Sequence, residues 1–290
     1  MTRHGGGSVF LLTDYGHADE FAGVVRAVVV RDAPGAPLVD LTHDVPSFGV
    51  RAGALALRRA APHLGPGVVL AVVDPGVGTA RRAVAVSVES SGRRDGPGWF
   101  VGPDNGLLPW ALDELGGADA AAVLRPSRRG ATTFDGRDVF APAAACLWRG
   151  GAIEEVGDPI DPASLVRLPD PVISVRPGVV RCEVLWIDHF GNVQLAAGPD
   201  DATAAGLGLD VATAAGPDPA LEVVTAGASW AVRRVGTFAE LTGHELGLVA
   251  DANGRLALVC DRRPAATVLG VGEGDEVTLR AAPAGRAPGR

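Results

Sequence analysis

Residues 67–82 read GVVLAVVDPGVGTARR, and this stretch decides which fold the rest of the chain supports. Its unbroken apolar run from 68 to 73 is typical of a strand buried on both faces. The run ends on Asp74, and the Pro-Gly-Val-Gly sequence that follows predicts a tight turn. A buried strand therefore delivers a carboxylate at its C-terminal end, with Arg81 seven positions later.

The sequence on the N-terminal side of this strand alternates between two patterns. Short apolar runs, SVFLLTD at 8–14 and PLVDLTHD at 37–44, predict strands, and the longer Ala/Val/Leu/Arg patterns at 19–33 and 50–64 predict helices. Strands that alternate with helices are typical of a mainly parallel sheet with covering helices. In such sheets ligands bind beyond the carboxyl ends of the strands, where Asp14, Asp40 and Asp74 fall.

The second half of the chain has a different composition. Prolines punctuate the segment around 169–178, and beyond it short strand-like runs are separated by Gly, Asp and Asn. We therefore predict an α/β domain at 1–168, a linker at 169–178, a smaller all-β, barrel-like domain at 179–282 and a disordered tail at 283–290.

Composition excludes several functions. The net charge of −8 disfavours binding to nucleic acid or to an anionic membrane, and the absence of lysine excludes a Schiff-base or P-loop lysine. The three cysteines have no metal-ligand spacing, so we expect free thiols and no metal. Because no signal peptide or long apolar span is evident, we expect a cytoplasmic protein.

Each polar motif allows more than one interpretation when it is taken alone. Asp14 can cap a helix or accept hydrogen bonds from ribose hydroxyls. Asp74 and Arg81 can form a structural ion pair or a reactive site. Asn105, in GPDNGLL, can simply make an Asx turn, and the acids of TTFDGRD and WIDHFGN are equally ambiguous.

Taken in order, the motifs resemble one family from about residue 8 to about residue 280. They are TD-x-G, DLTH, VDPGVGT-x-RR, GPDNG, TF-x-GRD-x-FAP and ID-x-FGN. The chain resembles the S-adenosylmethionine hydroxide adenosyltransferases, which are related to enzymes that fluorinate or chlorinate the same substrate. The resemblance implies an α/β domain, a C-terminal β-barrel, and a homotrimer with active sites between subunits.

The resemblance also implies roles for individual residues. Asp74 and Arg81 match two members of the family's Asp-Arg-His group, which positions and activates water, and Asp135 at the third position is our further catalytic candidate. The positions that match substrate contacts, from the ribose to the adenine and the methionine, are Asp14, Phe48, Asn105, Phe134, Asp188, Phe190, Asn192, Arg263 and Ala265. S-adenosylmethionine is then the substrate, and no cofactor is expected.

The sequence departs from the family's pattern at two places. Asp135 stands where the hydrolases usually have histidine and the halogenases tyrosine. Ala252 and Asn253 stand where relatives usually carry a serine that helps to bind the methionine end. We expect a hydrolase that yields adenosine and methionine. A halide adenosyltransferase, or a protein that binds S-adenosylmethionine or adenosine without turnover, is the alternative.

Overall fold

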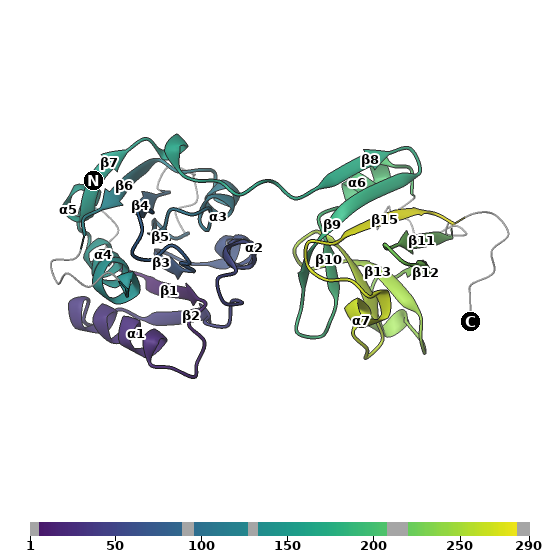
Figure 1. The fold of residues 1–290 in the computed structure, drawn as a ribbon, viewed down its shortest axis with the longest axis horizontal. Coiled ribbons are helices and arrows are strands. Elements are labelled where there is room, and N and C mark those ends of the chain that lie inside the picture. The colour runs from purple at the N-terminus through teal and green to yellow at the C-terminus, as the bar shows by residue number, and fades with distance from the viewer. Residues whose placement is uncertain (1–5, 89–95, 127–132, 208–219, 283–290) are drawn as a thin grey trace. The chain divides into compact units, whose positions relative to one another are not determined.

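The computed structural model describes residues 6–88, 96–126, 133–207 and 220–282 (Figure 1). The chain divides into two compact units, Met1–Leu168 and Pro169–Arg290, which we call the α/β unit and the barrel unit. The tail predicted at 283–290 lies outside the described residues. None of the helices in the described ranges has the length and apolar character needed to cross a membrane.

The α/β unit contains the strands and helices that the apolar runs predict. Its strands are β1 (Ser8–Thr13), β2 (Leu38–Thr42), β3 (Gly67–Val72), β4 (Ala83–Ser87), β5 (Trp99–Pro103), β6 (Ala120–Leu124) and β7 (Gly157–Ile160). Its helices are α1 (Phe21–Asp32), α2 (Val50–Ala60), α3 (Pro109–Glu114), α4 (Ala141–Trp148) and α5 (Ile153–Val156). Short helical turns lie at Ala61–His63 and Pro162–Ser164, and a π-helical turn, Gly136–Phe140, leads directly into α4.

The seven strands of this unit form one sheet in the order β2-β1-β3-β5-β4-β6-β7. Strands β2, β1, β3 and β5 are mutually parallel, whereas β4 and β7 run antiparallel to their neighbours. Five of the seven strands therefore share one direction, which confirms the predicted mainly parallel sheet. Helices α1 and α4 pack together, as do α2 and α3 (Figure 1).

The strand order creates a switch point between β1 and β3. From β1 the chain crosses to β2 at one edge of the sheet, and from β3 it continues towards β5 on the other side. Ligands in open α/β sheets bind at such a point, beyond the carboxyl ends of the strands. Thr13 is in register with Val72, so Asp14 and Asp74 follow neighbouring parallel strands at this point.

The barrel unit is built almost entirely from strands. They are β8 (Ile173–Arg176), β9 (Val179–Ile187), β10 (Val193–Leu195), β11 (Leu221–Val224), β12 (Ser229–Arg234), β13 (Leu246–Ala250), β14 (Leu256–Cys260) and β15 (Glu276–Ala281). Two short helices, α6 (Pro199–Ala204) and α7 (Ala265–Leu269), and a turn at Phe238–Glu240 complete the unit.

Pairing between β9 and β10 closes the barrel. The strand order runs β10-β14-β13-β12-β11-β15-β9-β8, and the additional β9–β10 pairing joins the ends of a seven-strand ring. Strand β9 serves as the common member because its nine residues are long enough to pair with β15, β8 and β10. The predicted barrel-like domain is thereby confirmed.

The segment predicted as a linker, 169–178, contains a strand. The unit boundary falls between Leu168 and Pro169, at the start of that segment, but residues 173–176 form β8 and pair with β9. Strand β8 pairs on one side only, so it is an edge strand. The prolines at 169, 171 and 177 flank it without removing a ladder hydrogen bond, which reconciles a proline-rich sequence with a strand.

Candidate active site

Asp74 and Arg81 form a bidentate ion pair at the C-terminal end of β3. The turn after Asp74 is closed by hydrogen bonds from the N–H of Val77 to the Asp74 carbonyl and from the Thr79 hydroxyl to the Gly76 carbonyl. This reversal returns Arg81 to the carboxylate, where Nε donates to Oδ1 at 3.1 Å and Nη2 to Oδ2 at 2.6 Å. The pairing expected from the sequence is therefore present.

Asp135 joins this pair from a distant part of the chain. It immediately precedes the π-helical turn that leads into α4, and its Oδ2 accepts a hydrogen bond from Arg81 Nη2 at 2.7 Å. The side chains of Asp74, Arg81 and Asp135 are only 6%, 9% and 18% exposed. One guanidinium thus holds two carboxylates in a largely buried cluster, which we call the acid–arginine cluster. With both acids ionised it carries one net negative charge.

Burial sets the acidity of the central carboxylate. Removal from water raises the pKa of Asp74 above its ordinary value, Arg81 opposes this shift, Asp135 adds to it, and the N–H of Gly76 opposes it. The net result is a raised pKa of Asp74, because Arg81 does not fully offset the effect of burial. A carboxylate with a raised pKa is a stronger base than an exposed aspartate, and it can accept a proton from a bound nucleophile.

Aromatic rings surround the acid–arginine cluster. The guanidinium carbon of Arg81 lies 5.4 Å from the centre of the Phe140 ring. Phe134 is packed edge-on against Tyr15 and Phe21, with ring centres 5.8 and 5.2 Å apart. Phe134, predicted to contact substrate, is thus partly buried in the core that covers the sheet. Tyr15 lies in the same group of rings, and the sequence motif that contains it predicted a role only for the neighbouring Asp14.

Asp14 and Phe48 are brought together at the end of β1. Asp14 Oδ2 accepts a hydrogen bond from the backbone N–H of Phe48 at 2.9 Å. Phe48 has a φ of 64°, a left-handed conformation that is costly for a bulky residue. The residue is 73% exposed. The structure therefore presents an aromatic ring beside the carboxylate that the resemblance assigns to the ribose, and strain of this kind is found at ligand-binding positions.

Asn105 supports the strand that carries Asp74. Its side-chain amide donates to the Val73 carbonyl at 2.9 Å, and its side-chain oxygen accepts from the N–H of Leu107 at 3.2 Å. The predicted Asx-type turn is therefore present, and a further hydrogen bond joins it to the backbone just after β3. Because Val73 directly precedes Asp74, Asn105 fixes the backbone from which the carboxylate projects.

In the barrel unit, Asp188 and Asn192 close the tight turn between β9 and β10. Asp188 Oδ1 accepts from the N–H groups of Phe190 and Asn192, both at 2.9 Å, and Oδ2 accepts from the Asn192 side-chain amide at 2.8 Å. Phe190 projects from this turn and is 74% exposed. These hydrogen bonds therefore fix the conformation of the turn from which Phe190 projects.

The segment 262–266, which contains the predicted Arg263 and Ala265, packs against the same turn. Ala266 donates its N–H to the Gly191 carbonyl at 3.0 Å, and a Cβ on Gly191 would lie 2.4 Å from Pro264 Cβ. Ala265 is fully buried, and the Arg263 guanidinium contacts the His244 ring. The barrel residues that the sequence identified therefore gather around one turn, although they are more than seventy positions apart.

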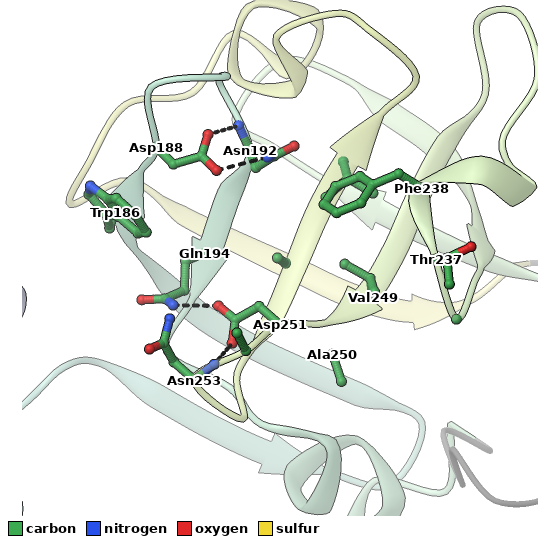
Figure 2. Close-up of a pocket in the computed structure, with 14 residues that line it drawn as sticks. Trp186, Asp188, Asn192, Gln194, Thr237, Phe238, Val249, Ala250, Asp251 and Asn253 are labelled. Atoms are coloured by element: carbon green, nitrogen blue, oxygen red, sulfur yellow. Dashed lines mark hydrogen bonds between the residues drawn. The ribbon is translucent and has the colours of Figure 1, made fainter. Parts of the chain in front are cut away.

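A cavity of about 430 Å³ opens beside this turn (Figure 2). Val249, Ala257 and Val259, from the small buried cluster of the barrel, give it an apolar wall. The other lining residues are Trp186, Asp188, Asn192, Gln194, Gly236, Thr237, Phe238, Ala250, Asp251, Ala252 and Asn253. The predicted Asp188 and Asn192 are among them, as are Ala252 and Asn253, which depart from the family pattern; Phe190, Arg263 and Ala265 are not.

Sequence reasoning missed a second polar pair in this cavity. The Gln194 side-chain amide donates to Asp251 Oδ2, and Asp251 Oδ1 accepts from the N–H of Asn253 at 2.8 Å (Figure 2). The same Oδ1 also accepts from the N–H of Arg255 at 2.9 Å. The pairing of Trp186 with Gln194 across β9 and β10 places both in the wall. The sequence WIDHFGNVQ covers the end of β9 and the start of β10, and residues alternate between the two faces of each strand. This alternation is the sequence signal that could have identified Trp186 and Gln194 as wall residues. Within the described residues, no three His, Cys, Asp or Glu side chains form a group that could hold a metal.

Family models match both units. The N-terminal domain of S-adenosylmethionine hydroxide adenosyltransferases matches residues 9–157, and the C-terminal domain matches 182–278. An (R)-S-adenosyl-L-methionine hydrolase of Salinispora tropica is 41% identical over 93% of this chain and 96% of its own. One from Thermus thermophilus is 45% identical over 63% of this chain and 72% of its own.

More distant relatives extend the comparison. A fluorinase of Actinoplanes sp. is 27% identical over 72% of this chain and 77% of its own. The crystal structure of an uncharacterized conserved protein from Thermotoga maritima has a TM-score of 0.82 at 31% identity, and the match covers 94% of this chain and 99% of that one. From the matches to both of its domains, the chain belongs to the S-adenosylmethionine hydroxide adenosyltransferase family.

Proposed function

We propose that this protein hydrolyses S-adenosyl-L-methionine to adenosine and L-methionine. The observation that carries the proposal is the acid–arginine cluster at the switch point of the sheet, where burial gives Asp74 a raised pKa and Arg81 fixes its orientation. The similarity to proteins named (R)-S-adenosyl-L-methionine hydrolase, at 41% identity over nearly the whole chain, supports the same substrate.

The reaction is a displacement at the 5′ carbon of the ribose. A water oxygen forms a bond to this carbon while the carbon–sulfur bond breaks, and the bonding pair leaves with the sulfur of methionine. The sulfonium starts with a positive charge and departs neutral, so the leaving group needs no general acid. The water must lose one proton, and Asp74 is the group that accepts it.

The remaining candidate residues hold the substrate. Asp14 accepts hydrogen bonds from the ribose hydroxyls, beside the exposed ring of Phe48. The barrel cavity carries two carboxylates, Asp188 and Asp251, and such a lining favours the cationic groups of the methionine end over an anion. In the active enzyme we propose a homotrimer with sites between subunits. We place it in the cytoplasm, where the free thiols of its three cysteines stay reduced.

The distant fluorinase similarity makes halide transfer the second candidate, and the cluster's charge argues against it. An ionised carboxylate about 4 Å from a halide repels it by roughly 4 kcal/mol at an effective dielectric constant near 20. Here a second carboxylate, Asp135, is bound to the same arginine. Water is neutral and donates hydrogen bonds to carboxylates, so this site favours it as the nucleophile.

Product analysis tests the proposal. The purified protein is incubated with S-adenosylmethionine, with and without a large excess of chloride, and the nucleosides are separated by chromatography. We expect adenosine alone, formed at a rate that chloride does not change. Formation of 5′-chloro-5′-deoxyadenosine would overturn the charge argument. Binding of the substrate without any product would favour a binding protein that has lost turnover.

A further inference from the structure

Tyr15 lies beside the acid–arginine cluster, and the proposed hydrolysis gives its hydroxyl group no role. It directly follows Asp14, and its ring packs against Phe21 and Phe134 with centres 6.0 and 5.8 Å apart. Its backbone N–H donates to Thr13 Oγ1 at 3.3 Å. These contacts hold the ring in one orientation, so the position of its hydroxyl is defined.

The hydroxyl of Tyr15 reaches the backbone next to Asp135. A Cβ built on Gly136 would lie 2.2 Å from the phenol oxygen and 3.2 Å from the ring carbon that bears it. Gly136 therefore leaves space that the phenol oxygen occupies. Because Gly136 follows Asp135, and Asp135 is bound to Arg81, the hydroxyl lies at the edge of the acid–arginine cluster.

Three carboxylates act on this phenol. Burial is the main factor that raises the pKa of Tyr15, and the negative charges of Asp14, Asp74 and Asp135 raise it further. The influence of these three acids on the pKa is Coulombic. The hydroxyl thus remains protonated at neutral pH, where it can donate a hydrogen bond but cannot serve as a base.

On the basis of the proposed hydrolysis, we propose that Tyr15 is a further catalytic residue, whose hydroxyl donates a hydrogen bond to the attacking water. A water molecule has two donor hydrogens and two lone pairs. Asp74 and Asp135 accept its two hydrogens, and the Tyr15 hydroxyl occupies one lone pair. A single lone pair then remains for the 5′ carbon, and fixing its direction is the kind of orientation that accelerates a displacement.

The test is the Tyr15→Phe variant, which keeps the ring and removes only the hydroxyl. We expect kcat to fall by about 10- to 100-fold, with the KM for S-adenosylmethionine changed by less than about threefold, as for loss of one preorganised donor. Phe21→Leu is the matched control, because it loosens the same aromatic group without touching a polar atom. It is expected to lower the thermal midpoint more than it lowers kcat.

A double variant separates water orientation from a structural role. In an Asp74→Asn background the water is no longer activated, so removing the Tyr15 hydroxyl is expected to cost much less than it does in the wild type. Equal losses in both backgrounds would overturn the inference, as would a Tyr15→Phe variant with wild-type kcat. An inactive wild type would instead overturn the proposed function, and this inference with it.

A second measurement uses the wild-type sequence and so does not depend on whether a variant folds. Tyr15 is the only tyrosine in the sequence, so incorporation of 3-fluorotyrosine labels this position alone. The fluorine resonance is expected to move with pH as Asp74, whose pKa is raised by burial, gains or loses its proton near the labelled ring. A resonance that is independent of pH across the acid limb of the activity profile would contradict the placement of the hydroxyl.

Discussion

The two units of this protein use polar side chains in opposite ways. In the α/β unit, Asp74, Arg81 and Asp135 are largely buried and bonded to one another, so their charges act on whatever binds beside them. In the barrel unit, Asp188 and Asp251 are bonded mainly to the N–H groups of their own turns, and they shape a cavity with an apolar wall. From this comparison we infer that the first unit supplies the reactive groups and holds the ribose, and that the second recognises the rest of the substrate.

The largest expected effect lies in the α/β unit. Asp74→Asn keeps the size of the side chain and removes its ability to accept a proton, so kcat is expected to fall about a thousandfold. The affinity for S-adenosylmethionine, measured by calorimetry, should change little. Asp113→Asn is the matched control, since Asp113 forms an exposed ion pair with Arg167 in the same unit. A wild-type rate for Asp74→Asn would remove this residue from the mechanism.

Substitutions in the barrel cavity should change KM more than kcat. Ala257→Leu adds volume to the apolar wall of the cavity, so KM is expected to rise at least about tenfold, with kcat at saturation changed by less than about twofold. Ala231→Leu makes the same change at an exposed position of β12 and is expected to leave both parameters unchanged. If Ala257→Leu lowered kcat and left KM intact, the division of roles between the units would be wrong.

The pH profile sharpens the contribution of the acid–arginine cluster. The base must be deprotonated to act, so kcat/KM should rise with pH through the pKa of Asp74, with a midpoint above the ordinary aspartate value of 3.8. The negative charge of Asp135 contributes to that elevation. Asp135→Asn is therefore expected to move the midpoint to lower pH, and a shift in the opposite direction would contradict the electrostatic account.

The same raised pKa has a consequence for stability. The folded state holds the proton of Asp74 more tightly than the unfolded state does, so this residue lowers the free energy of unfolding as pH rises from 3.8 through the folded-state pKa. Asp74→Asn removes that cost. Above the folded-state pKa, the variant is expected to match or exceed the thermal midpoint of the wild type.

The smallest expected effect concerns the strained aromatic at the end of β1. Phe48→Gly relieves a φ of 64° but adds the conformational entropy of glycine to the unfolded chain, so a net gain of only about 0.5 kcal/mol is expected. Loss of the exposed ring should raise KM at the same time. Denaturant unfolding together with steady-state kinetics checks both, and a loss of more than about 1 kcal/mol would mean that the residue is not strained.

Local patterns predicted the elements that depend on local sequence. The apolar runs ending at Asp14 and Asp74 gave β1 and β3, and the helices between them followed from their longer periodicity. The barrel strands were found in the same way. The closure of the barrel through β9 and β10, and the strand inside the proline-rich segment 169–178, depend on pairing between strands, which the local pattern does not encode.

In the candidate site, too, contacts between residues close in sequence were predictable and contacts between distant residues were not. The Asp74–Arg81 pair spans seven residues and was predictable from the turn between them. The bond from Arg81 to Asp135 spans 54 positions, and the sequence left open whether Asp135 faces the site. The orientation of Tyr15 depends on the absence of a Cβ at Gly136. The Gln194–Asp251 pair depends on the register of the strands. Contacts of this kind arise only when the sheet and the barrel have formed.

Isotope labelling of the solvent tests the central claim, that this protein directs water to the 5′ carbon of S-adenosylmethionine. The reaction is run in ¹⁸O-labelled water, and the products are examined by mass spectrometry. The account predicts that the heavy oxygen appears in the 5′ hydroxyl of adenosine and that methionine carries none. Adenosine without the label, or a product with the label in the methionine half, would contradict it.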